Sequence, residues 1–376
     1  MTKDRIPSPF YIVYEEKLRR NIELIRDVAS RADVEIIMAF KANALWRTFP
    51  ILREYGVDAT ASSLNELRLA REELGAKVHS YCPAYTPATI GEYLDGSTHI
   101  TFNSLSQAER FMPDVAARGS RVSAGLRVNP RCSVIETDLY NPALPGSRFG
   151  VSAEDMPDRL PDGIEGFHFH ALCESGPDDL AKVLDAFETQ FGRWLPQLKW
   201  VNMGGGHLMT REGYDTDRLV DLLRGFRRRH PNLHVILEPG SAWTWRTGDL
   251  IAEVVDVVCN QGVSTAIVDV SFACHMPDTL EMPYKPAVSE SSPSGRYIYR
   301  LGGNSCLSGD FIGDWAFDEP LTPGRRLTLE DMNHYTTVKT TMFNGIAHPA
   351  IVLCRADGSC EVLRRFTYDD YKSRMS

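Results

Sequence analysis

A lysine follows the first strongly apolar stretch of the chain. Residues 35–44 read EIIMAFKANA, so Lys41 comes directly after an apolar run and before only small residues and one amide. Burial disfavours the ammonium form and lowers the pKa of the amine, which can then condense with an aldehyde. The pattern therefore indicates a nucleophilic lysine. A lysine whose stem packs along an apolar rim while its ammonium group reaches water gives the same pattern.

A run of glycines points to a second kind of chemistry. The segment 203–207 reads MGGGH and follows another apolar stretch. Gly204, Gly205 and Gly206 leave their backbone N–H groups unshielded, which favours a phosphate-binding nest over an ordinary tight turn. The segment matches neither G-x-x-x-x-G-K-[ST] nor G-x-G-x-x-G, so nucleotide binding is not specifically indicated.

A glutamate ends a later apolar stretch. The sequence ILEPG at 236–240 places Glu238 before a Pro-Gly turn. A carboxylate beside a pyridine nitrogen keeps that nitrogen protonated, and the charged ring then accepts the electrons of a carbanion. Glu238 therefore favours decarboxylation, whereas an arginine at this position would suit racemisation better. A glutamate held in a salt bridge at the rim of the fold is the alternative.

Two histidines alternate with apolar residues in GFHFHALCE at 166–174. This alternation places His168 and His170 on the same side of a strand. They would bind a metal ion with His207 as a third ligand, or one imidazole would stack on a flat cofactor ring. Stacking is favoured, because a metal site leaves Lys41 and the glycines unexplained. An aldehyde, a phosphate and a pyridine ring together describe pyridoxal phosphate, and we predict no metal.

Short apolar runs would bring these residues together. The runs cover 34–40, 56–61, 77–83, 99–103, 121–129, 163–171, 198–206 and 233–240, with helical patterns such as 15–30 and 177–191 between them. Eight alternating units favour a (β/α)8 barrel over a doubly wound sheet. Active sites of such barrels lie at the carboxyl ends of the strands, where polar residues end these runs.

Helical patterns nearly vanish after about residue 250, and the turn signal ADGS at 356–359 indicates a hairpin. We therefore predict an α/β chain with two domains. The first is a pyridoxal phosphate-binding barrel over 12–250. The second is a mostly β sandwich or barrel, built from 1–11 and 251–376, that completes the active site.

The composition limits the partners and the compartment. The formal net charge is -9 and the one short basic block is RRRH at 227–230, which argues against nucleic acid and suits a cationic small molecule. The eight cysteines include no C-x-x-C pair, so we expect free thiols in a reducing compartment. Without an apolar signal core or a membrane-length apolar stretch, the chain is expected in the cytoplasm.

The ordered motifs resemble those of the fold-type III pyridoxal phosphate-dependent decarboxylases, such as ornithine, arginine and diaminopimelate decarboxylases. The motifs are AFKANA, DATASSLNEL, LRVNP, GFHFHALCES, MGGGH, LEPG, GGNSCLSGD and MNHYTTVKTTMFNG. Within that group the chain is most similar to the carboxynorspermidine and carboxyspermidine decarboxylases of polyamine biosynthesis, through FHFHALCE, LEPGSAWTW and FACHMPDTLEMPYKP. The resemblance implies a homodimer with shared active sites.

The resemblance also implies roles for individual residues. Lys41 would hold the cofactor, His170 would stack on its ring, and Glu238 would pair with the ring nitrogen. Asp58 and Arg127 would line the side of the site where Lys41 bonds the cofactor, and Cys306 of the partner subunit would protonate the product. The phosphate would be held by Gly204, Gly205, Gly206, Ser241 and Tyr335.

The chain departs from the family at two positions near the phosphate. Ser241 stands where relatives carry the arginine of E-P-G-R, and Cys173 stands where relatives carry a serine. The predicted substrate is a cationic carboxylated polyamine, which needs carboxylates or aromatic faces for its distal nitrogens. The candidates are Asp278, Glu281, Tyr284 and Asp310, with a solvated loop as the alternative for Asp278 and Glu281. Diaminopimelate or other basic amino-acid decarboxylation, and remotely a metal-dependent hydrolase, are the rival functions.

Overall fold

The chain divides into two units, which a computed structural model describes over residues 2–135 and 137–376. The barrel unit comprises residues 21–243, and the sheet unit comprises residues 1–20 and 244–376. The boundaries thus lie at different residues from those expected, 12 and 250. The first boundary falls inside helix α1 (Glu15–Ala32), because the amino-terminal turn of this helix groups with the sheet unit.

The barrel unit is built on one parallel sheet that closes on itself. The order is β2-β10-β9-β8-β7-β6-β5-β4-β3. The strands are β2 (Glu35–Ile36), β3 (Met38–Ala39), β4 (Ala59–Ala61), β5 (Val78–Tyr81), β6 (His99–Phe102), β7 (Ser123–Arg127), β8 (Ile164–His168), β9 (Trp200–Asn202) and β10 (His234–Leu237). The amide of Ile37 donates to the carbonyl of Leu237, and the amide of Phe40 donates to the carbonyl of Thr60. The segment 35–40 therefore pairs on both edges as one strand, which confirms the predicted (β/α)8 barrel.

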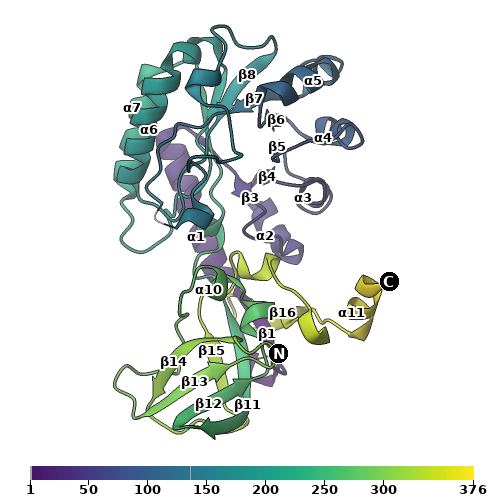
Figure 1. Ribbon diagram of the computed structural model, residues 1–376, viewed down its shortest axis with the longest axis vertical. Helices are drawn as coiled ribbons and strands as arrows, with labels where there is room; N and C mark the ends of the chain where they lie inside the picture. Colours follow the sequence, from purple (N-terminus) through teal and green to yellow (C-terminus); the bar gives the residue numbers. More distant parts are fainter. Residues whose placement is uncertain (1, 136) are drawn as a thin grey trace. The chain divides into compact units, whose positions relative to one another are not determined.

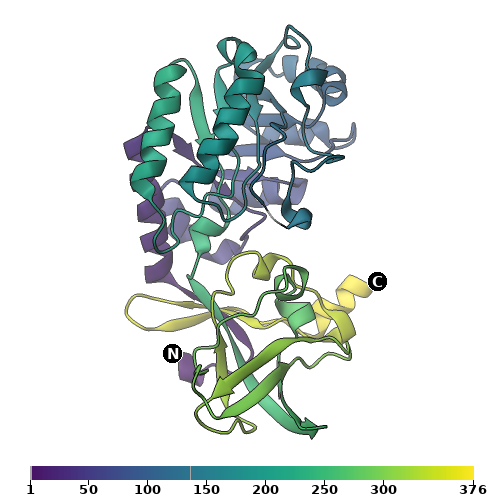
Figure 2. The same cartoon turned by 60° about the vertical axis from the view of Figure 1, so that its left-hand side comes forward.

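Helices surround this sheet. They are α1, α2 (Phe49–Glu54), α3 (Leu64–Leu69), α4 (Ile90–Gly96), α5 (Leu105–Ala116), α6 (Pro177–Phe191) and α7 (Thr216–Arg229). The predicted apolar face of α6 is buried, and α6 lies beside α7 in both views (Figure 1 and Figure 2). Between β7 and β8 the described residues form only 3-10 turns and irregular segments, so the expected alternation is interrupted there.

An indole fills the interior of the barrel. Trp200 on β9 is buried in a cluster with Ile37 and Ile236. A Cβ atom at Gly166 would lie 2.0 Å from the Trp200 ring, and one at Gly125 would lie 2.2 Å from it. Glycine on β7 and β8 therefore makes room for the largest side chain on β9, as close packing of a barrel interior requires.

The sheet unit is a mostly antiparallel sheet of order β14-β13-β12-β11-β1-β16-β17, with β15 pairing to β11. Its strands are β1 (Phe10–Tyr14), β11 (Gly248–Asn260), β12 (Val263–Val268), β13 (Tyr297–Gly302), β14 (Phe311–Phe317), β15 (Arg326–Leu329), β16 (Ala350–Cys354) and β17 (Cys360–Arg364). Short helices α9 (Phe272–His275), α10 (Asp278–Glu281) and α11 (Tyr368–Met375) accompany them. Along β1, Tyr11 packs in one apolar cluster whereas Phe10 and Ile12 pack in another, as the two-residue period of a strand dictates.

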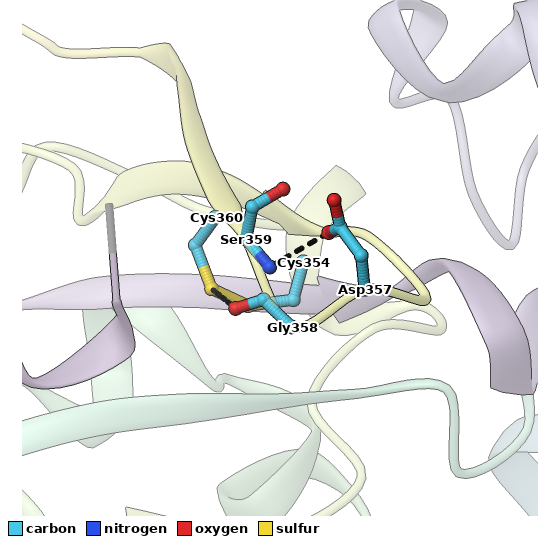
Figure 3. Close-up of a disulfide and its surroundings, with 5 residues drawn as sticks. All are labelled: Cys354, Asp357, Gly358, Ser359 and Cys360. Carbon is cyan, nitrogen blue, oxygen red and sulfur yellow. Dashed lines mark hydrogen bonds between the residues drawn. A yellow bond between two sulfur atoms is a disulfide. The ribbon is translucent and has the colours of Figure 1, made fainter.

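The hairpin of β16 and β17 corrects one expectation. Cys354 and Cys360 lie opposite each other in the register and form a disulfide (Figure 3), so this pair is not free. The ADGS turn reverses the chain between them, which brings residues six apart in sequence to a Cα separation of 4.1 Å. The other six cysteines are free thiols, as predicted. Among the described residues, no helix has the length and apolar character that crossing a membrane requires.

Candidate active site

Lys41 lies in the turn that follows β3, at the carboxyl end of the barrel strands. By accessible area it is an exposed residue, yet desolvation by the surrounding protein lowers the pKa of its amine. Both observations describe a side chain that contacts solvent while nearby protein atoms restrict its hydration. The cation of Arg127 lowers the pKa further, whereas the carboxylates of Glu238 and Glu66 oppose the shift. The amine is therefore easier to deprotonate than that of an ordinary surface lysine.

Glu238 follows β10 and is held on both carboxylate oxygens. Its Oε1 lies 2.7 Å from Nε2 of His168, and its Oε2 accepts a hydrogen bond of 3.2 Å from the side-chain amide of Asn202. Burial raises the pKa of this carboxyl group, but the hydrogen bond and charge of His168 and the charge of Lys41 outweigh burial. The pKa of Glu238 therefore lies well below its usual range, and the group is an anion at neutral pH.

His168, the last residue of β8, is buried beneath this carboxylate. Its ring stacks on that of Tyr81 with centroids 5.2 Å apart and an interplanar angle of 25°. Desolvation lowers the pKa of the imidazole despite the neighbouring Glu238. A neutral imidazole that bonds a carboxylate through Nε2 must carry its proton there, so we assign the proton of His168 to Nε2.

His170 lies two residues beyond His168 and is half-buried. Its Nδ1 accepts a hydrogen bond of 3.1 Å from the amide of Gly205. Burial, together with the cations of Lys41 and Arg127, holds the pKa of His170 well below its ordinary value. His170 is therefore a neutral imidazole with its proton on Nε2, which is an uncharged flat surface suitable for contact with an aromatic ring.

The three glycines lie where neighbouring backbone segments approach closely. A Cβ atom at Gly204 would be 2.4 Å from the carbonyl oxygen of Phe169, and one at Gly205 would be 2.6 Å from that of Glu238. The amide of Gly204 donates to the Asn202 side chain at 2.8 Å, and the amide of Gly205 donates to His170. Two of the three amides thus bind protein groups, so the predicted phosphate nest depends on Gly206 and on groups outside the triplet.

Arg127 ends β7 and is almost fully buried. Its guanidinium lies 4.6 Å from the ring centroid of Tyr81 and 4.4 Å from that of Phe149, and it donates to the carbonyl of His170 at 3.5 Å. Burial lowers the pKa of this guanidinium. The structure therefore brings Arg127 together with Lys41, His168, His170 and Glu238.

The structure corrects the predicted position of Asp58 beside Lys41. It precedes β4 and therefore lies at the amino end of the parallel sheet, opposite to Lys41, where its carboxylate accepts a hydrogen bond of 2.8 Å from the amide of Lys77. The predicted run 56–61 begins three residues before β4, which starts only at Ala59, so Asp58 precedes the strand. The carboxylate that acts on Lys41 from this strand–helix unit is that of Glu66.

Glu66 was not predicted to belong to the site. Its carboxylate accepts a hydrogen bond of 2.6 Å from the amide of Ser62, while Ser63 caps α3 through the amide of Glu66. The sequence signal was the serine followed three residues later by glutamate, which is typical of a helix start. That signal explains the helix but does not reveal the proximity of the carboxylate to Lys41.

In the sheet unit, Cys306 is exposed in the connection between β13 and β14, and its amide donates to the side chain of Asn344 at 2.8 Å. Asp310 is buried, and its carboxylate accepts hydrogen bonds from the amide of Ala273 and from both the amide and the hydroxyl of Ser305. These hydrogen bonds hold the Cys306 connection in place, and the role of Asp310 as a substrate ligand stays a prediction.

Asp278 and Glu281 on α10 share one cation. The ammonium group of Lys339 bonds the Asp278 carboxylate and lies 2.6 Å from Oε2 of Glu281. The predicted pair lies on a short helix and already has a cation of its own chain. Tyr284 is 40% exposed nearby in sequence. Tyr335 has φ of 52°, which is strained for an aromatic residue and is a feature that clusters at functional sites.

The barrel residues form a donor set with a definite chemistry. An amine of lowered pKa binds an aldehyde, an anionic carboxylate binds a protonated pyridine nitrogen, and a neutral imidazole face packs on a flat ring. Ser241 begins α8 (Ser241–Thr244) directly after the Pro-Gly turn, close in sequence to Glu238. Among the described residues, no three His, Cys, Asp or Glu side chains are arranged to hold a metal ion. These residues therefore fit pyridoxal phosphate.

Comparisons with known proteins give the family. The family model described as Pyridoxal-dependent decarboxylase, C-terminal sheet domain, matches residues 11–333. A carboxyaminopropylagmatine decarboxylase of Synechocystis sp. is 48% identical over 98% of this chain and 96% of its own length. A carboxynorspermidine/carboxyspermidine decarboxylase of Campylobacter jejuni is 39% identical over 100% of both chains.

Solved structures agree with this result. The crystal structure of carboxynorspermidine decarboxylase from C. jejuni, complexed with norspermidine, has a TM-score of 0.90 and 38% identity, covering 98% of this chain and 100% of the other. A diaminopimelate decarboxylase from Helicobacter pylori, with a TM-score of 0.85 but 17% identity, shares the fold. This chain therefore belongs to the pyridoxal-dependent decarboxylases, and its cofactor is pyridoxal phosphate.

Proposed function

We propose that this enzyme decarboxylates carboxynorspermidine, carboxyspermidine or both, and thereby forms norspermidine or spermidine. The observation that carries the reaction type is Glu238, which is anionic, partly buried and held at the same barrel end as Lys41. The substrate class is supported by the full-length similarity to the C. jejuni enzyme, whose solved structure contains norspermidine.

The residues of the barrel divide the chemistry among them. When bound, pyridoxal phosphate supplies an aldehyde for the substrate amine and a ring that accepts the electrons of the breaking carbon–carboxylate bond. Lys41 would hold the cofactor through its amine, whose lowered pKa favours the neutral form. Glu238 holds a proton at the ring nitrogen, because its anionic carboxylate favours the protonated form. His170 presents a neutral face to the ring, and Gly206 and Ser241 are the proposed phosphate ligands of the barrel unit.

A second subunit would complete the site. We propose a homodimer in which Cys306 of one subunit protonates the product carbon in the other. Cys306 is exposed, and the next residue, Leu307, is 44% exposed. Phe343, which precedes the Asn344 that bonds the Cys306 amide, is 50% exposed. Exposed apolar residues around an exposed thiol suit a protein interface. Sedimentation of the purified enzyme tests the dimer, and subcellular fractionation tests the expected cytoplasmic location.

A guanidinium-bearing substrate is the second candidate. The Synechocystis relative at 48% identity is a carboxyaminopropylagmatine decarboxylase. Agmatine ends in a planar guanidinium, which binds carboxylates through a fork of donors, whereas the end of a norspermidine or spermidine is an ammonium group. The two candidates therefore differ in the group that the distal part of the site must recognise.

One assay separates these functions. Purified enzyme is supplied with carboxynorspermidine, carboxyspermidine, carboxyaminopropylagmatine and diaminopimelate, and the release of carbon dioxide is measured. We expect kcat/KM for carboxynorspermidine or carboxyspermidine to exceed that for diaminopimelate by roughly 100-fold or more. A preference for carboxyaminopropylagmatine would select the second candidate. Activity on diaminopimelate alone would refute both.

A further inference from the structure

Two buried side chains hold the carboxylate of Glu238 from two directions. His168 bonds Oε1 at 2.7 Å, and Asn202 donates to Oε2 at 3.2 Å. A carboxylate offers about four lone-pair positions, so this pair of contacts leaves acceptor capacity on both oxygens. The contacts fix the plane and the direction of the carboxylate, and they leave it able to accept one more hydrogen bond.

His168 is itself fixed. It is 1% exposed, its ring stacks on Tyr81, and the guanidinium of Arg127 covers the Tyr81 ring. Its Nδ1 is buried without a hydrogen-bond partner among the described residues. Burying Nδ1 without a hydrogen-bond partner costs free energy. The contact made by the other ring nitrogen must therefore offset that cost. That nitrogen is Nε2, which bonds Glu238.

Asn202 extends this arrangement to the glycine triplet. The oxygen of its side chain accepts the amide of Gly204, while its nitrogen donates to Glu238. The next amide, that of Gly205, donates to His170. Hydrogen bonds therefore connect the carboxylate to Gly204 through Asn202, and the following amide, that of Gly205, bonds His170, so Glu238 is tied to the glycine triplet and has little freedom.

We infer that His168 is a positioning residue, which acts through Glu238 to aim the free lone pairs of that carboxylate at the ring nitrogen of pyridoxal phosphate. The two histidines of H-x-H thus have different tasks, since His170 contacts the cofactor ring and His168 orients the group that binds its nitrogen. The inference concerns the cofactor, so it stands independently of which carboxylated polyamine is the substrate.

The test compares two ligands that differ only at the ring nitrogen. Apo-protein is titrated with pyridoxal phosphate and with its 1-deaza analogue, in which a carbon replaces the ring nitrogen, and binding is followed by tryptophan fluorescence. For His168→Phe, which keeps an aromatic ring against Tyr81, we expect affinity for pyridoxal phosphate to fall about 10-fold or more and affinity for the analogue to change less than about 3-fold. His168→Gln retains an N–H donor and should regain most of the loss.

The controls separate positioning from general damage. In Glu238→Gln, which cannot act as an anion, adding His168→Phe should cause no further selective loss for pyridoxal phosphate, because the two residues act in series. Thermal unfolding of each apo-variant shows whether it is folded, and His168→Asn replaces His168→Phe if the latter is not. Equal losses for both ligands, or an unchanged affinity for pyridoxal phosphate, would overturn the assignment. Carbon dioxide release by the unmodified enzyme tests the proposed function separately.

Discussion

Each end of the barrel carries one glutamate surrounded by histidines. At the amino end, Glu35 on β2 lies 2.7 Å from Nε2 of His234 and 4.0 Å from Nε2 of His79, whose ring is 4.0 Å from that of His99. At the carboxyl end, Glu238 has the same 2.7 Å contact to an imidazole nitrogen, that of His168. The two clusters contain the same residue types, yet we assign chemistry to only one of them.

The difference lies in what adjoins each glutamate. The amino end adjoins the interior indole, because His99 packs edge-on against Trp200. The carboxyl end adds an amine of lowered pKa, the glycine triplet and a buried guanidinium. A glutamate–histidine pair therefore becomes a site when a reactive group and an accessible acceptor lie beside it. Where only protein groups surround such a pair, we expect it to serve the stability of the barrel.

The largest expected effect is a loss of activity when the lysine at the carboxyl end, but not a lysine at the amino end, is replaced. Lys41→Ala should lower kcat by roughly 1,000-fold or more, because the amine that holds the cofactor is lost. Borohydride treatment followed by mass spectrometry should then find no covalent cofactor adduct. The matched control is Lys77→Ala, an exposed lysine that precedes β5 at the amino end. It should retain activity within about 2-fold. A cofactor adduct in the Lys41 variant would contradict the assignment.

The second prediction exchanges the two glutamates for amides. Glu238→Gln should lower kcat about 100- to 1,000-fold, because the anion that keeps the ring nitrogen protonated is removed. Glu35→Gln should leave kcat nearly unchanged and lower the free energy of unfolding by about 1 kcal/mol, since its partner His234 is largely exposed. Carbon dioxide release and urea unfolding measure the two effects. Similar kinetic losses in both variants would remove the distinction between the ends.

The third prediction concerns the stability of the amino end in acid. Desolvation, together with the charge of His99, lowers the pKa of His79 to about 3, while Glu35 opposes the shift. Above the unfolded pKa of 6.5, His79 is neutral in both states. As pH falls below 6.5, the unfolded state binds a proton that the folded state excludes. His79 should therefore contribute about 2 kcal/mol of stability at pH 7 that is lost by pH 5.

Urea unfolding between pH 7 and pH 5 checks this value. In His79→Gln the free energy of unfolding should decline less steeply with falling pH than in the unmodified chain, by about 2 kcal/mol over that interval. The slope is the informative quantity, because the substitution changes the absolute stability as well. Parallel curves for the two proteins would show that His79 does not titrate in this way.

The comparison of the two ends also shows what the sequence determines. Lys41 and Glu238 could be predicted to meet, because each follows an apolar strand and parallel strands bring their carboxyl ends to one side. Asp58 could not be placed, since β4 begins at Ala59, three residues after the start of the predicted run, and Asp58 therefore precedes the strand at its amino end. Alternation put His168 and His170 on one side of a strand, but it could not tell which histidine bonds Glu238.

Hydrogen-bond partners and cross-strand pairs also could not be predicted from the sequence pattern. The glycine triplet was visible, yet two of its amides donate to Asn202 and His170, and no local signal encodes those partners. The ADGS turn predicted the hairpin, but the disulfide of Cys354 and Cys360 depends on the register of the strands. Local patterns thus specify elements, whereas the contacts made between elements require the folded chain.

The smallest expected effect extends the comparison to the carboxylates of the sheet unit. Asp278 and Glu281 share the ammonium group of Lys339, so they resemble the amino end of the barrel in having a protein partner. If they nevertheless bind a distal nitrogen of the substrate, Glu281→Gln should raise KM about 3- to 10-fold and affect kcat less. Lys339→Met should lower KM, because the competing cation is removed. An unchanged KM in both variants would make this ion triad a structural element of the sheet unit.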